Sequence, residues 1–265
     1  MSRIQWTTAL AALLVLGLVS WSCSPGSSPA PKPEAQAEAP KVAEKPAARE
    51  EAAPAVPVVA AASAEKTVPL LVVRPPQAPM PTPAIVKPNP YLEPYSDKPQ
   101  PALMVPEGLT NLALGKPVTS SDAMPIIGDL KMVTDGDKTG LDGMYVELAP
   151  GRQWAQIDLG ATSLIHAIVV WHYNMQKYIV YHDVVIQVAD DADFIQNVQT
   201  VFNNDYDGSS SLGIGKDLEY FDDFRGRVFD AKGAKGRYVR LYSNGNTMND
   251  MNQYVEVEVW GKPAK

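Results

Sequence analysis

Proline is distributed so unevenly along this chain that it limits which residues can fold into a compact domain. Twenty of the 24 prolines fall between Pro25 and Pro106, and no aromatic residue occurs between Cys23 and Tyr91. A segment of this composition buries too little apolar surface to offset the conformational entropy that folding costs. We therefore expect one folded domain, residues 107–265, preceded by a segment that does not fold by itself.

Residues 23–106 are rich in Pro, Ala, Glu and Lys without a fixed period. Proline holds the backbone extended and removes hydrogen-bond donors, so we expect a disordered, polyproline-like tether. At roughly 3.1 Å per residue it would reach on the order of 250 Å when fully extended. It is either a stem that carries the domain away from a membrane or a linker with no partner. The short apolar run from Val68 to Val73 is either a docking strand or no element at all.

The N-terminus has the pattern of an export signal. Arg3 precedes an apolar stretch from Ala9 to Val19, and small residues at Ser20 and Ser22 precede the only cysteine, Cys23. The stretch is short for a membrane span, so we expect a signal peptide over residues 1–22. Lipidation of Cys23 would anchor the protein at the outer membrane or in the periplasm. Ordinary signal peptidase would instead leave a free thiol on a secreted protein.

Charge narrows the class of partner. Residues 24–106 are neutral overall, whereas residues 107–265 carry 14 basic and 22 acidic side chains. Nucleic-acid binding needs Lys and Arg concentrated on one face, so we expect no nucleic-acid partner. The acidic balance favours a cation or a neutral ligand.

From Glu107 onward, short segments with a period of two alternate with clusters of Gly, Asn, Asp and Ser. The pattern predicts Ala155, Ile157 and Leu159 on one inward face. It also predicts the pair Val239 and Leu241, and the set Val255, Val257 and Val259, as inward-facing. The runs 166–171 and 183–189 are more continuously apolar, as in strands covered on both faces. These features predict an all-β sandwich of about eight strands.

Five motifs then follow one another in the order seen in discoidin domains. They are Asn111–Ser121, Thr134–Asp137, Trp154–Gly160, Arg237–Leu241 and Glu256–Gly261. The chain resembles the coagulation-factor 5/8 type C (discoidin) family, whose bacterial members include family 32 carbohydrate-binding modules. The resemblance covers residues 109–262 and implies a galactose-binding-like jelly roll.

The loop from Met132 to Thr139 places Asp and Thr oxygens close together around a glycine, as Ca²⁺ requires. In similar modules this loop and the start of the last strand hold a calcium ion. The resemblance therefore implies one structural Ca²⁺ and the following ligands: Met132, Asp135, Asp137, Thr139, Val255 and Glu256. The alternative is an Asx turn that is rich in Asp because Asp suits turns.

Aromatic and amide side chains are frequent in the loops that follow the core strands. Sugar recognition combines an aromatic face with planar groups that hydrogen-bond hydroxyls. The candidate ligand-binding residues are Tyr145, His172, Tyr173, Asn174, Tyr178, His182, Asn246 and Asn249. The alternative is that the amides form turns and the tyrosines cover the ends of the sandwich.

No sequence motif supports catalysis, because nucleophile and metalloprotease signatures are absent and the three histidines lack a paired carboxylate at a diagnostic spacing. We expect a non-catalytic binding module of an exported lipoprotein that recognises a glycan or cell-surface polysaccharide. The alternative is an adhesion or structural protein of the cell envelope whose domain binds another protein.

Overall fold

The computed structural model describes residues 65–75, 86, 87, 89–141, 143–174 and 178–265, which lie within one compact unit. The predicted signal peptide, Cys23 and much of the predicted tether lie outside the described residues. The described part of the chain holds ten strands and one 3₁₀ helix, η1 (Leu130–Thr134). The strands are β1 (Thr67–Pro69), β2 (Met104–Pro106), β3 (Thr110–Asn111), β4 (Val118–Ser120), β5 (Val146–Leu148), β6 (Gln153–His172), β7 (Val185–Ala189), β8 (Gln199–Asn203), β9 (Arg227–Ser243) and β10 (Asn252–Pro263). No described helix has the length and apolar character needed to cross a membrane.

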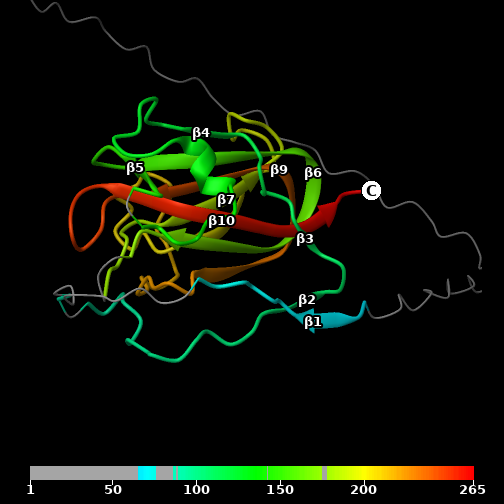
Figure 1. Ribbon diagram of the computed structural model, residues 1–265, viewed down its shortest axis with the longest axis horizontal. Coiled ribbons are helices and arrows are strands. Elements are labelled where there is room, and N and C mark those ends of the chain that lie inside the picture. The colour runs from blue at the N-terminus through cyan, green and yellow to red at the C-terminus, as the bar shows by residue number, and fades with distance from the viewer. Residues whose placement is uncertain (1–64, 76–85, 88, 142, 175–177) are drawn as a thin grey trace, which may run out of the picture. The chain divides into compact units, whose positions relative to one another are not determined.

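Eight of the strands form one antiparallel system in the order β3-β10-β6-β9-β7-β8, with β4 paired to β6 and β5 paired to β10. This confirms the predicted all-β fold of about eight strands. The long strands β6 and β9 belong to both layers of the sandwich (Figure 1). The first half of β6 pairs with β4, and its second half, from Ser163 to His172, pairs with β10.

A register shift in β6 marks the change from one layer to the other. Asp158 pairs with Tyr238 of β9, but the next paired residue, Ser163, lies opposite Gly236. Gly160 sits in this interval with φ +84°, a conformation that other residues rarely adopt. The extra residues bend the strand, so that the sheet folds over and encloses the main core.

The main core contains every inward residue predicted in the segments around Ala155 and Val239. Ala155, Ile157 and Val239 are fully buried, and Leu159 and Leu241 are nearly so. The prediction for the last strand needs a correction, because a register shift between Tyr254 and Glu256 moves Val255 to the opposite face. Tyr254 takes the place in the main core, next to Val257 and Val259.

A second hydrophobic cluster covers the outer face of β6 and β10. Val169, Trp171, Tyr145 and Val255 form its buried part. Leu70 and Val72, from the segment predicted to be a tether, pack against it. Because β6 alternates, Ile168 and Val170 face the main core while Val169 and Trp171 face this cluster.

The described residues before position 107 therefore differ from the predicted disordered tether. β1 pairs with β2, so part of the apolar run from Val68 to Val73 does dock as a strand. Residues 89–100, which we call the strap, are attached to the sandwich. The Arg227 guanidinium donates to both oxygens of Glu93 at 2.6 and 2.9 Å. The composition of a segment indicates whether the segment can form a core of its own. The segment before position 107 instead packs its apolar side chains against the surface of the sandwich.

Candidate functional site

We call the loop from Met132 to Thr139 the acidic loop. It overlaps the end of η1 (Leu130–Thr134), and its own carboxylates shape it. Asp129 caps the helix by accepting from Lys131 N at 3.1 Å. Asp135 Oδ1 accepts from the amide of Asp137 at 2.8 Å, and Asp137 Oδ1 accepts from the amide of Thr139 at 2.8 Å. The Asx turns of the alternative interpretation are therefore present, and each of them uses one carboxylate oxygen.

Glu256 of β10 joins this loop from the far end of the chain. Its Oε2 accepts from Gly136 N at 3.0 Å, while its Oε1 is buried and has no hydrogen-bond partner among the described residues. Burial, with Asp135 nearby, raises the pKa of Glu256 to about 8, although the Gly136 amide and Lys138 act in the opposite direction. A buried carboxylate oxygen without a donor, beside an acidic loop, fits a hard cation.

Two further contacts hold the loop against β10. Lys138 Nζ pairs with Glu258 at 2.7 Å and lies 5.2 Å from the centre of the Trp171 ring. Gly140 approaches Val255 so closely that an added Cβ would lie 2.9 Å from its Cγ2 atom. The structure thus brings Asp135, Val255 and Glu256 of the predicted ligand set to the same place. Met132 is half-buried against the main core, and Thr139 is exposed.

The predicted sugar-contacting residues lie in several environments. The rings of Tyr145 and Tyr173 stack 4.0 Å apart, with Tyr145 buried in the second cluster. Asn174 donates its side-chain amide to the carbonyl of His172 at 3.2 Å. These residues support the end of β6.

His172 lies in the core, which corrects its assignment to a solvent-facing loop. Its side chain is 1% exposed and stacks on Tyr181 at 4.2 Å. Its Nδ1 lies 3.1 Å from Asp222 Oδ1. Burial raises the pKa of Asp222. Tyr181, Asp222 and Tyr254 enclose the ring, so it cannot contact a ligand from solvent.

The loop before β10 is organised by its own amides. Asn246 is buried; its Oδ1 accepts from the amides of Met248 and Asn249, and its Nδ2 donates to Asn249 Oδ1 and Met251 O. Each of these Asn246 side-chain hydrogen bonds lies within the loop itself, as predicted by the alternative that the amides form turns. Asn249 is exposed at the tip.

His182 is the predicted residue that faces solvent beside other polar groups. Its side chain is 40% exposed, and its Nδ1 lies 2.7 Å from Glu219 Oε1. The bond to Glu219 raises the pKa of His182, with Asp183 adding to the effect. The second oxygen of Glu219 accepts from Asn89 Nδ2 at 2.7 Å. A strap residue and two loop residues therefore form one hydrogen-bonded chain.

An exposed aromatic pair continues this chain. Asn89 Oδ1 accepts from the amide of Tyr91, whose ring stacks on Tyr206 at 4.2 Å with the planes 2° apart. Tyr91 is 46% exposed and Tyr206 37%. We call these five residues the loop-end cluster: Asn89, Tyr91, His182, Tyr206 and Glu219. Of the five, only His182 is among the candidate ligand-binding residues from sequence. Asn89 and Tyr91 were missed because they lie in the segment assigned to the tether.

Tyr178 is not part of this cluster and lines a pocket between the strap and the residues before β9. Its ring meets Tyr95 edge-on at 4.5 Å and Phe221 at 6.0 Å. The structure therefore does not gather the predicted ligand residues into one site. It places His182 at the loop end, Tyr178 in the pocket, and Tyr145 with Tyr173 beside the second cluster.

A second acidic group consists of Asp183, Asp205 and Asp207. Asp183 Oδ2 accepts from Ser209 Oγ and Asn244 Nδ2, both at 2.8 Å. Asp205 accepts from three backbone amides of the following turn, those of Gly208, Ser209 and Ser210. These carboxylates shape their own loop, and we assign no ligand to them.

Comparison with solved structures gives matches to carbohydrate-binding modules. A family 32 module of the protein AlyQ, in complex with 4,5-unsaturated mannuronic acid, is 17% identical with a TM-score of 0.40, covering 54% of this chain and 92% of its own. A fucose-binding module of Streptococcus pneumoniae is 22% identical with a TM-score of 0.42, covering 57% of this chain and 97% of its own. A chitosan-binding module from a chitosanase/glucanase of Paenibacillus sp. IK-5 is 22% identical with a TM-score of 0.38, covering 57% of this chain and 99% of its own.

The domain resembles family 32 carbohydrate-binding modules. No family model matches the sequence, and neither does any curated protein. The ligands named for the matched modules belong to those proteins, and identities of 17–22% do not carry a ligand over to this chain.

Proposed function

We propose that this protein is a non-catalytic glycan-binding module carried by an exported lipoprotein. The observation that supports the proposal most is the loop-end cluster, in which an exposed tyrosine pair adjoins polar groups fixed by hydrogen bonds. Glu219 holds both His182 and Asn89, each at 2.7 Å, so these groups are oriented before a ligand arrives. Pre-oriented polar groups lose little entropy on binding.

The chemistry of the cluster suits a sugar ring. A tyrosine face packs against the apolar side of a pyranose, and imidazole, amide and carboxylate groups exchange hydrogen bonds with its hydroxyls. Tyr206 and Tyr91 supply the aromatic surface, and His182 supplies a half-exposed imidazole. Asn249 adds an exposed amide on the loop before β10.

A structural calcium ion is part of the proposal. Glu256 and Asp135, with Asp137, Thr139 and the carbonyls of Met132 and Val255, would hold it. The buried Oε1 of Glu256, which has no partner among the described residues, supports this set. A bound divalent cation would neutralise the carboxylates and fix the acidic loop to β10.

Anchoring through Cys23 remains a proposal from the sequence alone. The signal-like residues 1–22 and the single cysteine support a lipid anchor at the outer membrane or in the periplasm. Mass spectrometry of the mature N-terminus distinguishes a lipidated Cys23 from a free thiol or from cleavage elsewhere.

A glycan array with the mature full-length chain tests the function. We expect binding to specific glycans. This binding should fall about tenfold or more in Tyr206→Ala, because the contact between the tyrosine ring and the sugar is lost. Tyr238→Ala is the matched control, because Tyr238 lies inside β9, opposite Asp158 and next to the bend of β6, and is not part of the loop-end cluster. A flat array together with specific capture of one envelope protein would overturn the proposal in favour of protein binding.

A further inference from the structure

The pocket around Tyr178 has a volume of about 980 Å³ and is not formed by the sandwich alone. One wall is the strap from Glu93 to Gln100 together with Pro101, and the other is the segment from Phe221 to Arg227. The volume lies in the range of ligand sites. The strap belongs to the part of the chain that precedes the region of discoidin resemblance, so the resemblance implies nothing about this pocket.

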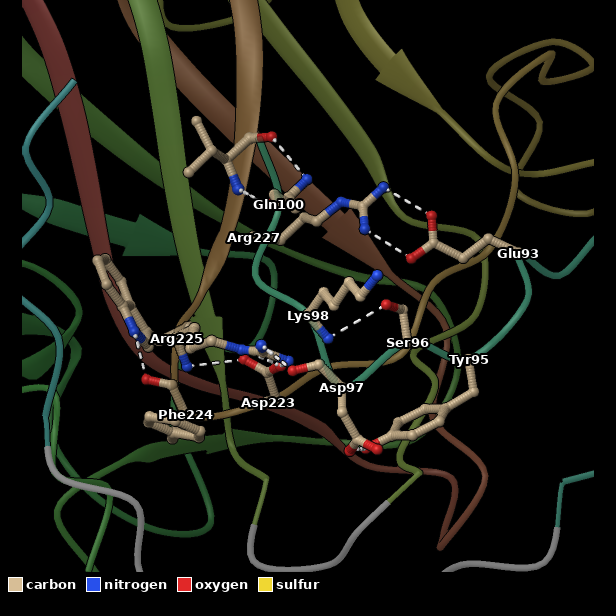
Figure 2. Close-up of polar contacts among 12 residues, drawn as sticks. Glu93, Tyr95, Ser96, Asp97, Lys98, Gln100, Asp223, Phe224, Arg225 and Arg227 are labelled. Carbon is tan, nitrogen blue, oxygen red and sulfur yellow. Dashed lines mark hydrogen bonds and ion pairs between the residues drawn. The ribbon is translucent and has the colours of Figure 1, made fainter. Parts of the chain in front are cut away.

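The strap is fastened on both sides of the pocket (Figure 2). At one side Glu93 forms its paired contact with Arg227. At the other, Gln100 Oε1 accepts from Val228 N at 2.9 Å and its Nε2 donates to Val228 O at 3.5 Å. Between these points Arg225 Nη1 donates to the carbonyl of Asp97 at 2.9 Å. The residues between the fastenings are exposed and form a rim.

Three aromatic rings meet inside this rim. Tyr95 of the strap lies edge-on to Tyr178 at 4.5 Å and to Phe221 at 5.3 Å. Tyr95 OH donates to Asp97 Oδ1 at 2.5 Å, which orients the ring. The described lining contains no Leu, Ile, Val or Met, so the apolar surface of the pocket is aromatic and proline-based.

The lining of the pocket carries four basic and four acidic side chains. Arg227 pairs with Glu93, and Arg225 pairs with Asp223. Lys98 and Arg74 also line the pocket, and neither side chain has a hydrogen-bond or ion-pair partner among the described residues. Figure 2 shows the Lys98 side chain between the Glu93–Arg227 pair and Tyr95. Of the two other carboxylates of the lining, Asp97 accepts from Tyr95 OH and the buried Asp222 contacts His172. Lys98 and Arg74 are therefore the two cations of the described lining that an incoming anion could pair with.

We infer that this pocket is a second saccharide site, which takes a carboxylate-bearing sugar such as a uronic acid, and that the strap is part of it. The aromatic rings would contact the apolar face of the sugar, and Lys98 and Arg74 would meet its carboxylate. An acidic peptide fits less well, because the described lining offers no aliphatic recess for peptide side chains. The inference rests on the proposed function in that it assumes a saccharide-binding protein, but it shares no residue with the loop-end cluster.

Calorimetric titration of the full-length mature chain with a galacturonic acid hexamer, and with its neutral methyl ester, tests the charge requirement. We expect the acid to bind and the ester to bind at least about tenfold more weakly, since charge-assisted hydrogen bonds are lost. Lys98→Gln should weaken binding of the acid by a similar factor, and Lys98→Arg should restore much of it. Lys66→Gln is the control, because Lys66 has the same charge and pairs with Glu107 outside the pocket. Binding of the acid should also weaken as salt rises.

The role of the strap is tested by a substitution that leaves the charge unchanged. Gln100→Ala removes both contacts to Val228, and we expect weaker binding of the hexamer, because the strap then spends less time docked. Gln199→Ala is the control, since Gln199 donates to Lys235 O at 2.7 Å on the edge strand β8 and does not line the pocket.

The outcomes separate this inference from the proposed function. Binding of the acidic hexamer that Tyr206→Ala leaves intact and Lys98→Gln reduces supports the second site. Equal binding of acid and ester, loss through Tyr206→Ala instead of Lys98→Gln, or preference for an acidic peptide overturns the second site and leaves loop-end glycan binding standing. If neither the hexamer nor any glycan of the array binds, both are overturned.

Discussion

Glu256 and Gly136 are 120 residues apart in sequence, and the carboxylate of the first accepts the amide hydrogen of the second at 3.0 Å. This contact ties the acidic loop to the last strand. It leaves the other carboxylate oxygen of Glu256 buried without a partner among the described residues. An unpaired buried carboxylate destabilises a fold, so a cation bound at this place would stabilise it.

Calcium should therefore stabilise the protein. At about 100-fold above its dissociation constant the gain is about 2.7 kcal/mol, or a rise of about 5–10 °C in Tm, and chelator should reverse it. Glu256→Gln should lose most of this shift, because it removes the central carboxylate. Asp193→Asn, an exposed aspartate outside the loop, should retain it. An unchanged Tm at millimolar calcium would rule out the site.

Stability should also depend on the protonation of His182. Glu219 and Asp183 raise its folded-state pKa above the ordinary value of 6.5. The interaction of His182 with these carboxylates therefore contributes its full stabilisation below the unfolded-state pKa of His182. This stabilisation is lost as pH rises through the folded-state pKa. We expect Tm to fall as pH rises above about 6.5, and His182→Gln to flatten this fall. NMR titration of the imidazole gives the pKa directly.

His166 provides an internal comparison for that pH dependence. Burial and the nearby Lys262 lower its pKa, so its contribution has the opposite slope with pH. His166→Gln should therefore remove a rise in Tm at pH values below about 6.5 and leave the fall above about 6.5 unchanged. A His182 pKa at or below 6.5, or a fall that His182→Gln leaves unchanged, would contradict the assignment.

Gly226 should tolerate no side chain. Its φ is +72°, and a Cβ there would lie 2.5 Å from Cε2 of Trp171. Gly213 is a matched control, since its φ is +90° but nothing lies within 4 Å of the added atom. We expect Gly213→Ala to cost about 1 kcal/mol through backbone strain and Gly226→Ala about 3 kcal/mol, because a clash is added. Urea unfolding measures both; equal losses would show that Trp171 moves aside without cost.

The N-terminal segment should contribute to stability in an alternating pattern. Leu70 packs against the second cluster, whereas the neighbouring Leu71 is 81% exposed. We expect Leu70→Ala to lower the free energy of unfolding by about 1–2 kcal/mol and Leu71→Ala by less than about 0.5 kcal/mol. Equal effects would mean that the segment is not docked in solution.

Local pattern predicted the sandwich correctly where alternation and burial coincide. Ala155, Ile157 and Val239 face the core because their strands keep a regular period of two. The same rule misplaced Val255, since the register shift next to it depends on how β10 pairs with β6 and is not encoded in hydrophobicity. One displaced residue was enough to move that side chain to the other face.

The candidate site was less predictable, because its residues meet through tertiary contacts. The sequence placed Glu256 beside the acidic loop only through a family resemblance. It placed His172 in solvent, whereas contacts with Tyr181 and Asp222 enclose the ring. Tyr91 and Tyr95 were assigned to a tether on composition, although single aromatic residues in a proline-rich segment can dock on a surface formed elsewhere.

The ion pair between Glu65 and Lys262 has a geometric consequence for presentation. Lys262 lies at the end of β10 and Asn252 at its start, so the described chain begins at the end of the sandwich opposite the loop before β10. Twelve residues of strand at about 3.3 Å each separate the two ends by roughly 40 Å. If the chain before Glu65 were anchored, this end of the sandwich would face the anchor and the loop before β10 would face away from it.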